Sequence, residues 1–98
     1  MGTAEISRNV AAGQTLELLD FSSNLNTTYL FLFTYSGRAG LYSVNNDGVV
    51  GIAPSRAITL NDNTGTYALY VESGKLYFKN NHATNTQSMA YRLLNAIG

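Results

Sequence analysis

The sequence predicts an all-β fold, an antiparallel, jelly-roll-like β-sandwich of about eight strands. Short runs rich in Leu, Val, Ile, Tyr, Phe and Thr recur about every 8 to 12 residues, a spacing typical of sandwiches and barrels. The 11 Asn, 10 Thr and 8 Ser account for 29 of the 98 residues, and these side chains favour turns and strands over helices. Hydrophobic residues make up 45% of the chain and include 7 Tyr and 4 Phe, which is enough for a bulky core.

The strands are expected at nine apolar runs, each bounded by Gly, Asn, Asp or Ser. In chain order these runs are Ile6–Val10, Thr15–Leu19, Thr28–Tyr35, Gly40–Val44, Val49–Ala53, Ala57–Leu60, Thr66–Glu72, Lys75–Asn80 and Met89–Asn95. Turns are expected where Gly and Asn, which tolerate positive φ, cluster between the runs. The turn segments are Ser36–Gly37 with Gly40, Asn46–Gly48, Asn61–Asn63, Ser73–Gly74 and Asn80–His82.

A chain of 98 residues has room for one compact domain. Residues 14–98 are expected to form a single β-sandwich. The segment before them has little apolar content and is interrupted by Ala11–Ala12–Gly13, so residues 1–13 are expected to be an N-terminal arm or linker. We expect neither a secretory signal nor insertion into a membrane, because no apolar run approaches the roughly 20 residues that cross a bilayer.

The clearest pair of strands is the hairpin that turns at Ser73–Gly74. A two-residue turn sets four cross-strand pairs: Glu72–Lys75, Val71–Leu76, Tyr70–Tyr77 and Leu69–Phe78. Because side chains alternate along a strand, this register gives the core one apolar set: Leu69, Val71, Leu76 and Phe78. The opposite face carries an adjacent tyrosine pair among charged residues: Tyr70, Glu72, Lys75, Tyr77 and Lys79.

The run Thr28–Tyr35 has no polar face. Tyr and Phe occupy every second position from Tyr29 to Tyr35, and the positions between include Leu30 and Leu32. Such a strand needs cover on both sides, so Leu30 and Leu32 are the candidate oligomer interface. A local loop and a second copy of the protein are equally good candidates for that cover. The following strand is expected to return beside this one, with Leu41 and Tyr42 on its two faces.

No catalytic residue, metal site or cofactor is predicted. The only histidine, His82, lies in the turn segment Asn80–Thr84, and no strained nucleophile motif accompanies it. The chain has no cysteine, which excludes thiolate zinc sites. The oxygen-rich turns Asn45–Asp47 and Asn61–Asn63 lack the spaced carboxylates of a helical calcium loop. A calcium ion shared by these two turns is the minor alternative to ordinary turn chemistry.

The outward face of the hairpin is the candidate ligand site. It consists of Tyr70, Lys75, Tyr77 and Lys79, with the loop residues Asn80 and Asn81. A tyrosine ring offers an apolar plane to the C–H side of a sugar, while Asn and Lys form hydrogen bonds with its hydroxyls. A weakly bound surface glycan is therefore one expected partner, and an intersubunit or linker contact is the other. Zero net charge and the neighbouring Glu72 disfavour nucleic acid.

Several of these runs together resemble the closing β-sandwich of bacteriophage fibre or tail proteins. They are Leu30–Phe33, Gly40–Val44, Asp47–Ile52, Lys75–Asn80 and Ala90–Leu94, within a likeness that covers residues 15–98. The resemblance implies a homo-oligomer, often a trimer, that meets the host surface or anchors a fibre to the virion. The chain lacks the His-x-His pairs of fibre tips that wrap around iron, and no family binding residue is carried over by position.

The sequence thus predicts a non-catalytic binding or assembly module of a phage-type fibre or tail protein, attached to a host glycan and located on the virion. The alternative is a bacterial carbohydrate-binding module or lectin-like domain, located outside the cell or on its surface. Oligomeric state separates the two, because fibre domains are expected to be multimers and free modules to be monomers.

Overall fold

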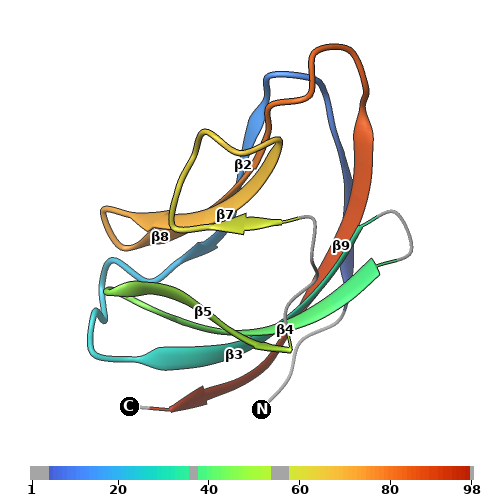
Figure 1. Ribbon diagram of the computed structural model, residues 1–98. Helices are drawn as coiled ribbons and strands as arrows, with labels where there is room; N and C mark the ends of the chain where they lie inside the picture. The colour runs from blue at the N-terminus through green and yellow to red at the C-terminus, as the bar shows by residue number, and fades with distance from the viewer. Residues whose placement is uncertain (1–4, 36–37, 54–57, 98) are drawn as a thin grey trace.

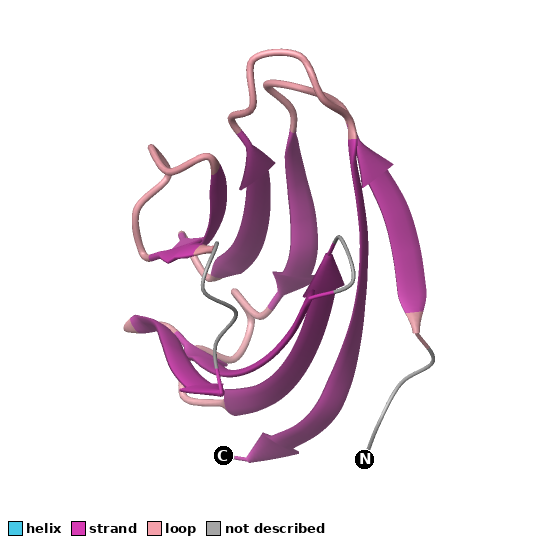
Figure 2. Ribbon diagram, turned by 45° about the vertical axis from the view of Figure 1, so that its right-hand side comes forward, coloured by secondary structure: helices cyan, strands magenta, loops and turns pink. Residues whose placement is uncertain are grey.

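The computed structural model describes residues 5–35, 38–53 and 58–97, and these residues form a β-sandwich (Figure 1). Sheet A has five strands in the order β1-β9-β3-β4-β5, and sheet B has four in the order β2-β8-β7-β6. Figure 2 shows the two sheets layered against each other, with sheet B on one side of sheet A. The predicted all-β sandwich is confirmed, with nine strands in the described residues.

The observed strands follow the predicted runs closely. They are β1 (Ile6–Val10), β2 (Thr15–Asp20), β3 (Thr28–Tyr35), β4 (Arg38–Asn45), β5 (Gly48–Ala53), β6 (Thr59–Leu60), β7 (Tyr67–Glu72), β8 (Lys75–Asn80) and β9 (Gln87–Ile97). Neighbouring strands are antiparallel except β6 and β7, which are parallel. The expected turn at Ser36–Gly37 and the expected strand start at Ala57 lie outside the described residues.

Residues 6–10, which we expected in an N-terminal arm, belong to the sandwich. They form β1 and pair with β9 from Ile6 opposite Tyr91 to Val10 opposite Gln87. Val10 is buried in the core. The apolar content of β1 is low because this strand lies at the edge of sheet A and buries few of its side chains.

The hairpin of β7 and β8 has the predicted register, with Tyr70 opposite Tyr77 and Leu69 opposite Phe78. Its turn residues Ser73 and Gly74 both have positive φ, 53° and 73°, as the tight turns of twisted hairpins require. The side chains of Leu69, Leu76 and Phe78 are buried, whereas Val71 is half-buried.

Aromatic rings join the two sheets in the core. The ring centroids of Phe33 in sheet A and Phe78 in sheet B are 5.2 Å apart, and those of Tyr35 and Tyr67 are 5.4 Å apart. Phe31, Phe33 and Tyr35 are buried on the inner face of β3, as its alternation predicts. Leu41 and Tyr42 lie on opposite faces of β4, and Tyr42 is fully buried.

Gly40, which we expected at the junction of a turn and a strand, lies inside β4. A side chain at this position would collide with the ring of Tyr42 two residues later on the same face. The missing side chain therefore makes room for a large aromatic ring in the core, a common use of glycine inside strands.

Asn61 closes the free edge of β5. Its Oδ1 accepts a hydrogen bond of 2.7 Å from the amide of Val49, and its Nδ2 donates one of 2.7 Å to the carbonyl of Val49. The backbone amide of Asn61 also donates to the carbonyl of Leu69 on β7, at 2.9 Å. Asn61 thus bonds to backbone groups at the edge of sheet A and also pairs with β7 in sheet B. These bonds connect the two sheets.

We expect Asn61→Ala to lower the free energy of unfolding by about 1–2 kcal/mol, because it removes two hydrogen bonds to a partly buried backbone. Asn61 has a positive φ of 61°, so Asn61→Gly, which tolerates this backbone, separates the bonds from the backbone conformation. Urea unfolding measures both variants. An unchanged midpoint for Asn61→Gly would show that the edge bonds do not stabilise the sandwich.

Candidate functional site

Tyr70 and Tyr77 lie side by side on the outer face of sheet B. They are opposite each other on β7 and β8, their ring centroids are 5.4 Å apart, and their planes are inclined by 28°. Both side chains are half-buried. The predicted face of the hairpin therefore presents a stacked pair of tyrosine rings. We call the surface formed by Tyr70, Lys75, Tyr77 and Lys79 the tyrosine face.

Thr15 on β2 is one of the polar groups near the phenol of Tyr70, although β8 lies between their two strands. Burial raises the pKa of the Tyr70 phenol above its ordinary value, with further contributions from Glu72 and Tyr77.

Lys75 is paired with a carboxylate on the neighbouring strand. Its Nζ lies 3.4 Å from Oε1 of Glu17 on β2. The hydrogen bond and the charge of Glu17 raise the pKa of the Lys75 ammonium. We expected Glu72, which is opposite Lys75 in the hairpin, to be this partner. The tyrosine face therefore carries a solvent-exposed pair of opposite charges beside Tyr77, which is opposite Glu17.

A polar pocket adjoins Tyr70 on the side away from Tyr77. It has a volume of about 470 Å³ and is lined by Asn61, Asp62, Asn63, Tyr70, Val71 and Glu72. Hydrogen bonds from the side chain and amide of Thr64 hold the pKa of Asp62 below its ordinary value, so this carboxylate is charged at neutral pH.

Sequence reasoning did not connect this pocket with the tyrosines. The sequence analysis predicted only that Asn61–Asn63 form a turn. The parallel pairing of β6 with β7 brings this turn next to Tyr70, and no local sequence pattern indicates that pairing. The same reasoning missed Thr15 and Glu17, because the pairing of β2 with β8 joins segments about sixty residues apart.

Asn80 does not belong to the tyrosine face, which corrects our prediction. Its side chain is fully buried. Nδ2 donates to the carbonyls of Val10 at 2.9 Å and Asn85 at 2.8 Å, while Oδ1 accepts from the amide of His82 at 2.9 Å. Asn80 joins the end of β8 to β1 and to the loop before β9, and all of these bonds are internal.

Asn81 is also occupied within the fold. Its Nδ2 donates to the carbonyls of Asn63 at 2.7 Å and Gly65 at 2.8 Å, and its amide donates to the carbonyl of Thr66. Asn81 thus stabilises the loop that lines the polar pocket, and these hydrogen bonds are internal to the fold.

His82 organises a turn. Its Nδ1 accepts hydrogen bonds of 3.1 Å from the amides of Thr84 and Asn85, and its ring stacks on Tyr67 with a centroid distance of 6.5 Å. The turn position of His82 agrees with the sequence analysis, and its side chain is half-buried there.

Leu30 and Leu32 lie on the outer face of sheet A, where both are half-buried. Leu32 is opposite Leu41 on β4, and Leu30 is opposite Ser43. Within residues 5–35, 38–53 and 58–97, sheet B packs only on the other face (Figure 2). The described part of the chain therefore places no second sheet over these two leucines.

In the part of the chain that the structure describes, no three His, Cys, Asp or Glu side chains gather where they would hold a metal ion. No helix of the described residues is long and apolar enough to cross a membrane. Searches of protein-family models, curated proteins and solved structures gave no match to this chain.

Proposed function

We propose that the protein is a non-catalytic module that binds a surface glycan on its tyrosine face. The observation that carries this proposal is the stacked pair Tyr70–Tyr77 on the outer face of sheet B. A tyrosine ring on a sheet surface offers an apolar plane, and the C–H side of a pyranose packs on such a plane.

Polar groups surround the two rings. Beside Tyr77 are Lys79 and the ion pair of Lys75 with Glu17. The polar pocket that contains Asp62 adjoins Tyr70. Ammonium groups donate to sugar oxygens and carboxylates accept from sugar hydroxyls. Tyrosine rings flanked by both donors and acceptors support a neutral, hydroxyl-rich ligand better than a polyanion.

The setting that we propose is a phage-type fibre or tail protein that attaches a virion to its host, in keeping with the resemblance of the sequence. A shallow site of this kind binds weakly, so attachment would depend on several copies acting together. A bacterial carbohydrate-binding module is the alternative, and it would use the same face as a monomer. Light scattering at several concentrations separates the two, because the fibre setting requires a multimer.

Replacing Tyr77 with Ala is expected to lower glycan affinity about tenfold, since the loss of one stacked ring removes roughly 1–2 kcal/mol of binding free energy. Glycan arrays would identify a ligand for the wild type, and titration calorimetry would compare the variants. Tyr77→Phe is the matched control, because it keeps the ring and should bind within about twofold of the wild type.

Urea unfolding should show that Tyr77→Ala remains folded, so that a loss of binding is not a loss of structure. Equal binding by wild type and Tyr77→Ala, with both proteins folded, would reject the tyrosine face as the glycan site.

A further inference from the structure

The loop that joins β8 to β9 is held by the ring of its histidine. The loop spans residues 81–86 and lies at the top of the molecule in Figure 1. Nδ1 of His82 accepts hydrogen bonds from the amides of Thr84 and Asn85, both at 3.1 Å. Nε2 lies 3.4 Å from Nδ2 of Asn85, so both ring nitrogens face nitrogen donors. The two short bonds require Nδ1 without a proton, which the neutral imidazole provides when its proton is on Nε2.

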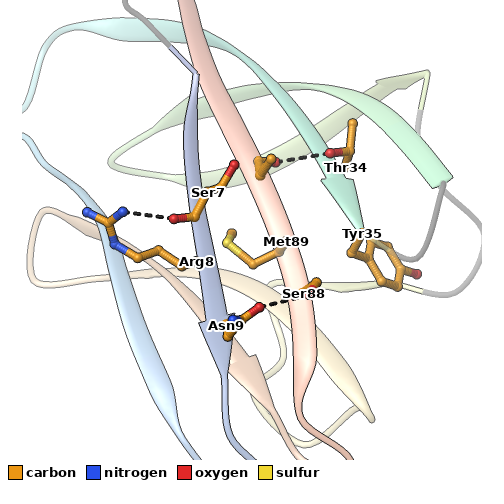
Figure 3. Close-up of a pocket in the computed structure, with 8 residues that line it drawn as sticks. Ser7, Arg8, Asn9, Thr34, Tyr35, Ser88 and Met89 are labelled. Carbon is orange, nitrogen blue, oxygen red and sulfur yellow. Dashed lines mark hydrogen bonds between the residues drawn. The ribbon is translucent and has the colours of Figure 1, made fainter.

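Both ends of this loop are fixed by bonds that do not involve the ring. At the β8 end, the buried Asn80 side chain accepts from the amide of His82 at 2.9 Å and donates to the carbonyl of Asn85 at 2.8 Å. At the β9 end, Ser88 is paired with Asn9 on β1, and its hydroxyl donates to Oδ1 of Asn9 at 2.8 Å (Figure 3). Loss of the ring bonds would therefore free the middle of the loop and leave the strands paired.

The bond from an amide to the side chain two residues earlier recurs at other turns of this chain. Asp20, Asn45 and Asp62 each accept such a bond through a side-chain oxygen. Asn45 does not titrate, and hydrogen bonds hold the pKa of both Asp20 and Asp62 below its ordinary value. These three acceptors therefore persist through the neutral range. A histidine in the same role is different, because its ring takes up a proton near neutral pH.

Protonation of His82 removes both ring bonds at once. An imidazolium carries a proton on each nitrogen and accepts no hydrogen bond, so its Nδ1 proton would face the amide protons of Thr84 and Asn85. These amides then need water as their acceptor, and the loop has to move to admit it. An ordinary histidine takes up its proton near about pH 6.5. The closed loop is thus the favoured form above this pH and is lost as the pH falls.

The surroundings of the ring do not hold it in the closed position once it is charged. Within residues 5–35, 38–53 and 58–97, no ion pair joins a carboxylate to His82, and residues 81–86 contain no other charged side chain. From β7, Tyr67 stacks on the ring at 6.5 Å, and a tyrosine face attracts a cation. Charged groups on the adjoining segments have other places: Lys79 is on the tyrosine face, Asp62 lines the pocket beside it, and Arg8 on β1 bonds to a neighbouring carbonyl.

We propose that His82 is a pH-sensitive latch: its neutral ring holds the β8–β9 loop closed, and its protonated ring releases the loop. The protonated ring stays on Tyr67, because the stacked tyrosine attracts its charge, while the backbone of the loop moves away from it. Tyr67 and residues 84–88 line a polar pocket of about 530 Å³. Release of the loop therefore reshapes this end of the sandwich without unpairing its strands.

Amide hydrogen exchange followed by NMR between about pH 7.5 and pH 5.5 tests the latch. The protection factors of the Thr84 and Asn85 amides should fall about tenfold or more as the ring titrates, because both amides lose their acceptor. The amide of His82, which is bonded to Asn80, should keep its protection. Ring carbon shifts of His82 in the same samples report when the ring is protonated.

His82→Asn is the matched control. A side-chain carbonyl at this position accepts bonds from the following amides, as Asn45 does in its own turn, and it does not titrate. This variant should therefore protect the Thr84 amide equally at both ends of the pH range, whereas His82→Ala should leave it unprotected throughout. Protection in the wild type that stays constant while the His82 ring titrates, or an equal pH-dependent loss in His82→Asn, would overturn the proposal.

Discussion

Replacing Phe78 with Ala is expected to lower the free energy of unfolding by about 3–5 kcal/mol. Phe78 is fully buried and its ring centroid lies 5.2 Å from that of Phe33 and 6.2 Å from that of Tyr67. The truncation would leave a cavity between the two sheets that rigid aromatic neighbours cannot fill. Urea unfolding followed by far-ultraviolet circular dichroism measures the change.

Leu25→Ala serves as the control for this truncation, because Leu25 is 45% exposed and should cost less than about 1 kcal/mol. A loss below 1 kcal/mol for Phe78→Ala as well would mean that Phe78 does not link the two sheets in solution.

Replacing Asn80 with Leu is expected to cost about 3 kcal/mol or more. The substitution keeps the approximate size of the side chain but removes the donors to the carbonyls of Val10 and Asn85 and the acceptor for the amide of His82. Each buried backbone group left without a partner costs roughly 1–3 kcal/mol. Urea unfolding gives the magnitude, and hydrogen exchange at His82 reports whether its amide has lost its acceptor.

Asn46→Leu is the matched control, since Asn46 is exposed in the turn between β4 and β5 and should change stability by no more than about 0.5 kcal/mol. If Asn80→Leu were equally neutral, the three bonds of Asn80 would not contribute to the stability of the fold.

Local pattern was sufficient for the strands and for the hairpin. Alternation along Thr28–Tyr35 separates the aromatic core side from the leucine side, and the structure buries Phe31 and Phe33 accordingly. Ser73 and Gly74 define a two-residue turn, which sets the register from Tyr70–Tyr77 to Leu69–Phe78. These predictions succeed because strand side chains alternate with a period of two and a tight turn leaves one register free of conflict.

The tertiary structure decided which polar residues are available to a partner. Asn80 and Asn81 follow each other at the end of one strand and look alike in the sequence, yet one bonds to β1 and the other holds the loop beside Tyr70. Glu17 pairs with Lys75 although the hairpin places Glu72 opposite that lysine. The role of a polar side chain depends on which backbone groups from distant segments need it as a hydrogen-bond partner. The local sequence pattern does not contain that information.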